Sequence, residues 1–472
     1  MKQSSGRLDP AVLKLAGVLV LGAMAPLLDS TIVNVALRTL AGDLDASLAT
    51  VQWVASAYLL ALVVAVPVTG WAHARYGGRR IWLTALVVFL LGSVLSANAW
   101  SIGSLIVFRV VQGFAAGLMM PVMVTMIMQA AGGRRVGKLI AVITLPALLG
   151  PILGPVIGGL ILGHLSWRWI FSVNVPLCVA AFLLAWRAVP ADRPGRAPRL
   201  DWPGLLLLCP ALAAMTYGLT QVGDQGGFAH ARVIAPVAAG ALLSAAFVAH
   251  ALHTTDPLID LRLLRTRSFT ASCVLLFASG LALFGSLLLL PLFFQELRGQ
   301  TVIATGLLLA PQGLGSLIAR PVGALADHTG PRPVIVASLA LTAGAALAFS
   351  FAGQHTPVLL LSGILVVLGF GISSANMGVM VGAFTDLTTD QLPHASSVIR
   401  IVQQLGGAFG AAVIAIVLQH QLTTHPAPQQ ALAFTHTFWL IAAFALLAVI
   451  PTLFLPSTRQ ARHRRRLPRP RV

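Results

Sequence analysis

The segment "ALLGPILGPVIGG" (residues 147–159) lies within a stretch, from Leu139 to Ser166, that contains no Asp, Glu, Lys or Arg. It nevertheless carries several Gly and Pro residues, the two residue types that weaken a helix most. In a water-soluble protein this pattern predicts a turn. Which structure it predicts here depends on the solvent around the chain, and the composition decides that.

The composition indicates that the solvent is mostly lipid. The 472 residues are 57% hydrophobic and only 9% charged, with a mean hydropathy of +0.88, whereas a soluble domain carries about 25% charged residues. Backbone groups in hydrocarbon must bond internally, which leaves helices or closed barrels. The apolar runs are about 20 residues long, a length that suits helices rather than barrel strands. We therefore predict an all-α membrane protein.

Fourteen apolar segments are long enough to be transmembrane helices. They lie near residues 13–37, 49–71, 81–101, 104–129, 138–163, 167–187, 202–222, 232–253, 269–295, 303–323, 333–353, 357–381, 397–419 and 434–456. Most of the 31 Lys and Arg residues fall in alternate loops and in both tails, as cytoplasmic segments require. This alternation predicts that both termini are cytoplasmic. Arg400 is interpreted as a loop anchor after the twelfth segment, which leaves Arg109 as the basic residue inside a span.

The charge pattern also excludes other classes of function. A net charge of +18 is compatible with nucleic-acid binding, but the charges are spread over loops and tails and are better explained as topology anchors and headgroup contacts. The first apolar segment is too long for a cleavable signal peptide. The three Cys residues fall in spans and imply no disulfide framework. We find no metal-ligand spacing, no Walker loop and no catalytic constellation, and we expect no cofactor and no enzymatic activity.

The chain contains an internal repeat. "GWAHARYGGRR" begins at Gly70 and "GALADHTGPRP" begins at Gly323, and the matching Gly and Arg residues share one constant offset. Parallel repeats of this kind are typical of transporters whose site lies between the halves near the midplane. We predict an N-terminal six-helix half (1–200), a two-helix insert (201–267), a C-terminal six-helix half (268–456) and a basic cytoplasmic tail (457–472).

The sequence resembles the major facilitator superfamily and, within it, the fourteen-helix drug:proton antiporters, over essentially the whole chain. The matching motifs are "LLDSTIVNVAL" (27–37), "GWAHARYGGRR" (70–80), "LIVFRVVQGFAAG" (105–117), "GPILGPVIGG" (150–159), "SWRWIFSVNVP" (166–176), "DPLIDLRLLRTRSF" (256–269) and "TGLLLAPQGLG" (305–315). The resemblance implies a proton-driven exporter of lipophilic small molecules in the cell membrane, which we expect to be a monomer. The alternatives are a dedicated exporter of one metabolite, such as an antibiotic or siderophore, and a non-transporting receptor or scaffold.

The resemblance implies that the two loop motifs clamp neighbouring helices on the cytoplasmic side. The motif residues are Gly70, Arg75, Gly77 and Arg79 in the first copy, and Gly323, Asp327, Gly330 and Arg332 in the second. The first copy departs from the motif because Ala74 replaces its usual Asp. The first clamp therefore depends on Arg75, Arg79 and helix ends, unless these Arg residues are only topology anchors.

The opening segment is interpreted as a gating helix. Gly150, Gly154 and Gly158 recur every four residues and form one stripe, beside Gly159 and the two prolines, Pro151 and Pro155. Small residues allow helices to pack closely in lipid, and proline favours a bend. The resemblance implies that this helix seals or gates the exporter, and the alternative is close packing alone.

Ionisable residues inside a membrane are functional candidates. Asp29 and Arg109 lie at similar predicted depths in the first and fourth spans, so they can pair directly or through water. Burial raises the pKa of a carboxyl and a nearby Arg lowers it, a balance that suits proton coupling. The alternative is a structural ion pair. Glu296, the only Glu of the chain, lies at the outer end of the ninth span and is a weaker candidate.

A small set of polar and aromatic residues is predicted to line the substrate cavity, although each alone fits helix packing. The set comprises Asn34, Gln52, Tyr58, Gln112, Phe293, Gln312, Asn376 and Gln403. Together they suit a lipophilic substrate of low specificity. The predicted partners are thus a small-molecule substrate, protons and the lipid bilayer, and not nucleic acid.

Overall fold

The computed structural model describes residues 9–46, 48–131, 139, 145–190, 200–225, 229–384, 387–388, 391–424 and 430–455. These residues form helices joined by short connections, with no strand in the described ranges. The N-terminal helices are α1 (Pro10–Asp43), α2 (Leu48–Ala65), α3 (Val68–Tyr76), α4 (Gly78–Ala97), α5 (Ile102–Ala130), α7 (Leu145–His164), α8 (Arg168–Ser172) and α9 (Asn174–Ala188). Next come α10 (Trp202–Gln225), α11 (Ala231–His253) and the short 3₁₀ turn η1 (Leu261–Arg265).

The C-terminal helices follow the same general pattern. They are α12 (Arg267–Leu292), which ends in the π-helical turn η2 (Phe293–Leu297), then α13 (Val302–Ile318), α14 (Arg320–Thr329), α15 (Pro331–Ser350), α16 (Val358–Phe384), α17 (Leu392–Thr424), α18 (Gln430–Leu447) and α19 (Val449–Thr452). A helix therefore overlaps each of the predicted spans. Within the described residues, 11 helices are long and apolar enough to cross a membrane, or 12 with one bent pair. An all-α membrane fold is thus confirmed, and the count of fourteen stays a prediction.

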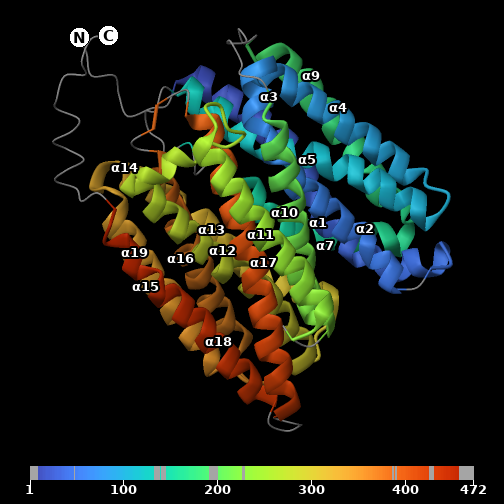
Figure 1. The fold of residues 1–472 in the computed structure, drawn as a ribbon. Helices are drawn as coiled ribbons and strands as arrows, with labels where there is room; N and C mark the ends of the chain where they lie inside the picture. The colour runs from blue at the N-terminus through green and yellow to red at the C-terminus, as the bar shows by residue number, and fades with distance from the viewer. Residues whose placement is uncertain are drawn as a thin grey trace.

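The helices form two bundles with a hairpin between them (Figure 1). In one bundle α1 packs against α2, α5, α7 and α9, and in the other α12 packs against α16, α17 and α18. The α10–α11 hairpin, drawn in green in Figure 1, joins them because α10 contacts both α2 and α17. Further contacts between the bundles join α7 to α13, and α17 to α3 and α5.

The repeated loop motif has a repeated backbone geometry. Gly77, between α3 and α4, has φ 83° and ψ 153°, and Gly330, between α14 and α15, has φ 88° and ψ 159°. Glycine adopts positive φ without a steric penalty, so each copy turns directly from one helix into the next. The two helices before the Gly77 turn, α2 and α3, meet at a 57° bend beside Pro67, which cannot continue the backbone ladder.

The structure corrects the interpretation of Arg400. The charge count assigned this residue to the loop after the twelfth span, although the predicted span 397–419 already contains it. In the structure α17 begins at Leu392, and Arg400 lies within the candidate span Leu392–Leu422. The prediction was wrong because the polar start of α17, "LPHASSVIR", resembles a loop in composition. Arg400 therefore belongs to the helix of a candidate span and not to the connection before it.

Candidate functional site

Asp29 is held in the interior of the N-terminal bundle. Its side chain is fully buried in α1 and forms an ion pair with Arg109 of α5 through Oδ2. Its Oδ1 accepts hydrogen bonds from Asn174 Nδ2 at 2.9 Å and from Gln112 Nε2 at 3.2 Å. Both carboxylate oxygens therefore have donors, the arrangement that a buried charge requires.

Arg109 is also fully buried. Its guanidinium forms hydrogen bonds through its N–H groups and contacts aromatic rings through its faces. Its Nε donates to the Val54 carbonyl at 3.1 Å, and its Nη1 also donates to Gln112 Oε1 at 2.9 Å. Its Cζ lies 4.1 Å from the centre of the Tyr58 ring, a cation–π distance. Its Nη2 is buried without a hydrogen-bond partner, so the guanidinium retains donors for a second arrangement of the carboxylate.

Ser93 of α4 completes this network behind Asp29. Its hydroxyl accepts from Asn174 Nδ2 at 3.0 Å and from Gln112 Nε2 at 3.2 Å, and donates to the Phe171 carbonyl at 2.9 Å. The network therefore joins α1, α2, α4, α5, α8 and α9. Sequence reasoning treated Gln112 as a possible cavity residue and missed Ser93, because a single Ser in an apolar helix is too common to be a signal.

Close packing of α5 on α2 positions Arg109. A Cβ atom at Gly113 would lie 2.2 Å from the Tyr58 carbonyl oxygen, and one at Gly117 would lie 2.2 Å from that of Leu62. Only glycine permits this approach. The close approach of α5 to α2 places the Arg109 guanidinium against the α2 backbone and the Tyr58 ring. Two glycines of the "RVVQGFAAG" motif therefore help to position the ion pair.

The glycine stripe of α7 faces the helix that carries Asp29. A Cβ atom at Gly154 would lie 2.0 Å from Thr31 Oγ1, and one at Gly158 would lie 3.0 Å from Ile32 Cγ1. The helix continues through the Gly- and Pro-rich segment from Leu145 to His164. The side-chain surroundings of Gly150, Pro151 and Pro155 lie outside what the structure describes, and the predicted bend and gating role stay predictions.

In the first loop motif, which has Ala74 in place of the usual Asp, Arg79 and His73 make the contacts to neighbouring helices. Arg79 donates from Nη2 to the Trp186 carbonyl at 2.7 Å and lies over the Trp186 ring, joining α4 to the end of α9. His73 lies 3.1 Å from Gln129 and joins α3 to α5. Arg75 is exposed and Ala74 is half-buried. In the second copy, Asp327 and Arg332 are half-buried and Gly323 is buried.

Three residues predicted to line the cavity are packed inside the protein instead. Tyr58 and Gln112 are buried beside Arg109. Phe293 is buried in an aromatic cluster with Phe294, Phe349, Phe434 and Phe438. Their rings and amide fill space between helices in this structure, and their assignment to the cavity wall stays a prediction.

The other predicted cavity residues have accessible surface or lie outside the described residues. Gln52 is exposed, and Gln312, Asn376 and Gln403 are half-buried. The side chain of Asn34 lies outside the described part of the chain. Glu296 is exposed in the π-helical turn after α12, which separates it from the buried network around Asp29.

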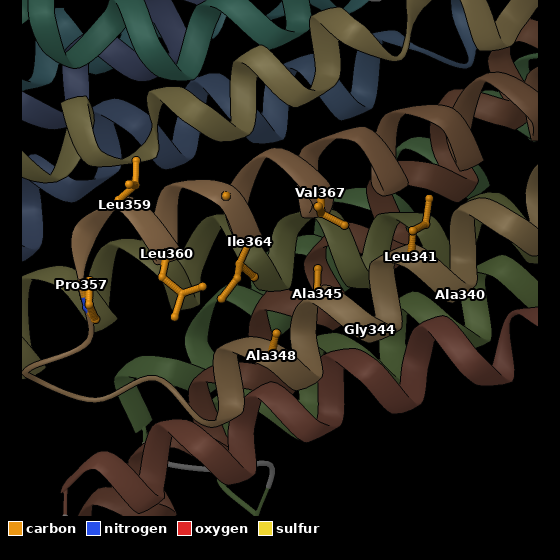
Figure 2. Close-up of a pocket in the computed structure, with 11 residues that line it drawn as sticks. Ala340, Leu341, Gly344, Ala345, Ala348, Pro357, Leu359, Leu360, Ile364 and Val367 are labelled. Atoms are coloured by element: carbon orange, nitrogen blue, oxygen red, sulfur yellow. The ribbon is translucent and has the colours of Figure 1, made fainter.

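A groove of about 860 Å³ lies on the C-terminal bundle between α15 and α16 (Figure 2). Its lining is apolar throughout, with Gly344 and Gly363 providing the space between Leu341, Leu360 and Ile364. It contains no polar side chain to orient a ligand or bind a proton, so it is not a candidate for the transport site.

Sequence reasoning also missed a polar cluster at the hairpin between the bundles. Asp201, just before α10, accepts from the Gly204 N–H at 2.9 Å and from the Leu258 N–H at 3.0 Å. His250 Nε2 of α11 lies 2.8 Å from Asp201 Oδ1. Burial by itself raises the pKa of the Asp201 carboxyl, but these hydrogen bonds outweigh burial and hold its pKa below the ordinary value.

Metal binding finds no support among the described residues. No group of three or more His, Cys, Asp or Glu side chains in the described ranges is arranged to hold a metal ion. The site consists of a buried carboxylate, a guanidinium with an N–H group that has no partner, and closely packed helices around them. These features suit reversible proton binding.

Two helical bundles with a repeated turn, a bridging hairpin and a buried carboxylate–guanidinium pair define a multi-pass membrane transporter. The family model of the Major Facilitator Superfamily matches residues 19–411 and 316–471. The chain belongs to the major facilitator superfamily, and the resemblance stated from its motifs is confirmed.

Curated relatives cover most of the chain. It is 38% identical over 419 residues to the multidrug resistance protein B homolog of Mycobacterium tuberculosis, covering 88% of this chain and 78% of that protein. It is 31% identical over 458 residues to the probable transport protein HsrA of Haemophilus influenzae, covering 96% and 98%. The similar proteins thus include named multidrug efflux transporters of this superfamily.

Solved structures agree on the fold at low sequence identity. The chain matches the proton:xylose symporter XylE with a TM-score of 0.63 and 14% identity, covering 96% of this chain and 98% of that one. It matches the human organic anion transporter MFSD10 with a TM-score of 0.64 and 17% identity, covering 94% and 100%. At these identities the likeness shows the fold alone.

Proposed function

We propose that the protein is a drug:proton antiporter that exports lipophilic small molecules by alternating access. The observation that carries the proposal is the network around Asp29, a fully buried carboxylate paired with Arg109 and bonded by Asn174 and Gln112. A carboxylate at this depth is costly and fits a group that takes and releases protons. The efflux names of its relatives agree with this function.

The proposed exchange of substrate for protons depends on two opposing effects on the Asp29 carboxylate. Burial disfavours its charged form, and the ion pair with Arg109 favours that form. Movement of α1 relative to α5 changes the distance between Asp29 and Arg109, and with it the balance between the protonated and ionised carboxyl. The α7 glycines that contact Thr31 and Ile32 place the proposed gating helix two residues from Asp29. A movement of α7 therefore reaches the proton site through a single helix contact.

The proposal includes a finer topology. Two six-helix halves, 1–200 and 268–456, flank a two-helix insert at 201–267, giving fourteen transmembrane helices with both termini and the basic tail 457–472 in the cytoplasm. Support comes from a helix at every predicted span and from the repeated glycine turns. The position of α10 against α2 and α17 suits an insert that fills the seam between the halves.

The test is Asp29→Asn, which preserves size and removes the titratable group. In inverted membrane vesicles with an imposed pH gradient, we expect this variant to lose gradient-driven substrate uptake at wild-type protein levels. Asp256→Asn, at an exposed position, is the matched control and should transport normally. Uptake by Asp29→Asn with an unchanged dependence on the gradient would contradict proton coupling at this site.

A further inference from the structure

Arg400 is a cationic side chain of the C-terminal bundle, and it takes no part in the proposed proton site around Asp29. It is half-buried within the apolar span of α17. Within the described residues it makes no hydrogen bond and no ion pair, and its Nε is buried without a partner. An unpaired guanidinium in a membrane interior is costly, so its retention calls for a counter-charge from elsewhere.

The surroundings of Arg400 place it where the two bundles meet. One turn before it on α17, Ser396 Oγ accepts a hydrogen bond at 3.2 Å from Thr125 of α5, in the opposite bundle. Arg400 also lies within electrostatic range of the Tyr58 hydroxyl of α2. Tyr58 donates to the Pro26 carbonyl at 3.1 Å, so its hydroxyl oxygen remains available as an acceptor. Because residues four apart share a helix face, Arg400 lies on the face of α17 that meets the N-terminal bundle.

The acidic residue of the nearby network cannot serve as its counter-ion. The carboxylate of Asp29 is already bonded by Arg109, Gln112 and Asn174, and the Tyr58 ring covers Arg109. Arg400 thus lies beyond a neutral aromatic ring from a charge pair that is already balanced. Transporters of this architecture bind their substrates near the midplane, between the halves, which is the region that Arg400 faces.

We propose that Arg400 binds an anionic group of the substrate, so that lipophilic organic monoanions, such as carboxylates and sulfonates, are preferred substrates. The planar guanidinium presents paired donors that match these groups. The inference rests on the proposed export function and narrows it to a substrate class. Exchange of an internal anion for an external proton moves net positive charge inward, so an inside-negative membrane potential assists export.

The test compares two dyes that differ in one charged group. 8-Anilino-1-naphthalenesulfonate is a lipophilic monoanion, and N-phenyl-1-naphthylamine is the same ring system without the sulfonate. Uptake of each is measured in inverted vesicles with an imposed pH gradient, and binding of each is measured on purified protein in lipid nanodiscs. The variants are Arg400→Gln, which removes the charge, Arg400→Lys, which keeps it, and Arg265→Gln, a control at an exposed position.

We expect Arg400→Gln to raise the half-saturating concentration and the Kd of the sulfonate at least about tenfold, the effect of losing a charged hydrogen bond. The neutral dye should be unaffected, which also shows that the variant is folded. Arg400→Lys should retain part of the sulfonate affinity, and Arg265→Gln should behave as wild type.

Three results would overturn the inference. They are an equal loss of both dyes in Arg400→Gln, unchanged sulfonate binding in that variant, and wild-type transport of the neutral dye without the sulfonate. The last result would leave proton-driven export standing. Sulfonate binding that depends on Arg400, with neither dye transported by the wild type, would support the anion site and contradict the export function instead.

Discussion

Arg109 shows how one side chain can serve several functions in a membrane interior. Its guanidinium pairs with Asp29, donates to the Val54 carbonyl and to Gln112, and lies over the Tyr58 ring. An ammonium group has the same charge but cannot reproduce the planar fork or the stacking. Geometry and charge can therefore be separated by one substitution.

Arg109→Lys should lower gradient-driven uptake at least about tenfold, because two or more charged hydrogen bonds of the guanidinium are lost. The measurement is initial uptake into inverted vesicles, normalised to protein in the membrane. Arg80→Lys, at an exposed position, is the control. If Arg109→Lys transports at the wild-type rate, charge alone is sufficient and the proposed positioning role is wrong.

At the scale of the helix, the contact between α7 and α1 is the closest link between the proposed gate and the proton site. The Gly154 position allows no side chain because of Thr31, whereas a Cβ atom at Gly163 of the same helix would have no neighbouring atom within 4 Å. The two glycines thus provide a matched pair on one helix.

Gly154→Leu should block transport, because the new side chain forces α7 away from α1, whereas Gly163→Leu should transport normally. Both variants are compared for membrane level and for gradient-driven uptake. Full activity of a well-inserted Gly154→Leu variant would show that the close α7–α1 contact is incidental to transport.

A second element, the α10–α11 hairpin, is fastened by Asp201. Because hydrogen bonds hold the pKa of this carboxyl below its ordinary value, its stabilising effect is present above about pH 4 and is lost as the pH falls further. Asp201→Asn should therefore lower stability at pH 7 by on the order of 2 kcal/mol.

The measurement is the midpoint of thermal unfolding of the purified protein between pH 3 and pH 7. The difference between wild type and Asp201→Asn should be constant near neutrality and should shrink below about pH 4. A difference that stays constant across the whole range would mean that the ionised carboxylate is not what fastens the hairpin. Asp260→Asn, which removes a similar carboxylate that caps η1, provides a comparison.

At the scale of the whole molecule, the distribution of charged residues limits how much positive charge a substrate can carry. The chain has 13 acidic residues against 31 basic ones, and the described part of the membrane interior contains the Asp29 carboxylate already paired with Arg109. A dication in a low-dielectric cavity needs nearby negative charge. The exposed position of Glu296 does not supply it.

Doubly charged cations should therefore be poor substrates. Propidium, a dication, should be taken up by inverted vesicles at least about tenfold more slowly than ethidium, its monovalent analogue, because the cost of burying charge without a counter-ion rises with each added charge. Uptake that requires the pH gradient is compared at equal dye concentration. Equal rates for the two dyes would contradict this limit and would direct attention to Glu296.

The sequence by itself determined the solvent, the class and the family of this protein. Long apolar runs force the backbone to bond within helices whatever the neighbours are, so the helical spans were predictable. The Asp29–Arg109 pair was predictable for a similar reason, since two charges at one depth in lipid have few other partners.

Only the tertiary structure decided which polar side chains meet. Ser93, Asn174 and Gln112 act together because α4, α5 and α9 converge behind α1, and no sequence spacing encodes that convergence. Tyr58 and Phe293 were predicted at a cavity surface but fill helix interfaces. Arg400 was assigned to a loop, and its place in the seam emerged from the start of α17. Helix existence is a local property of the chain, whereas the partners of a polar group depend on packing between distant helices.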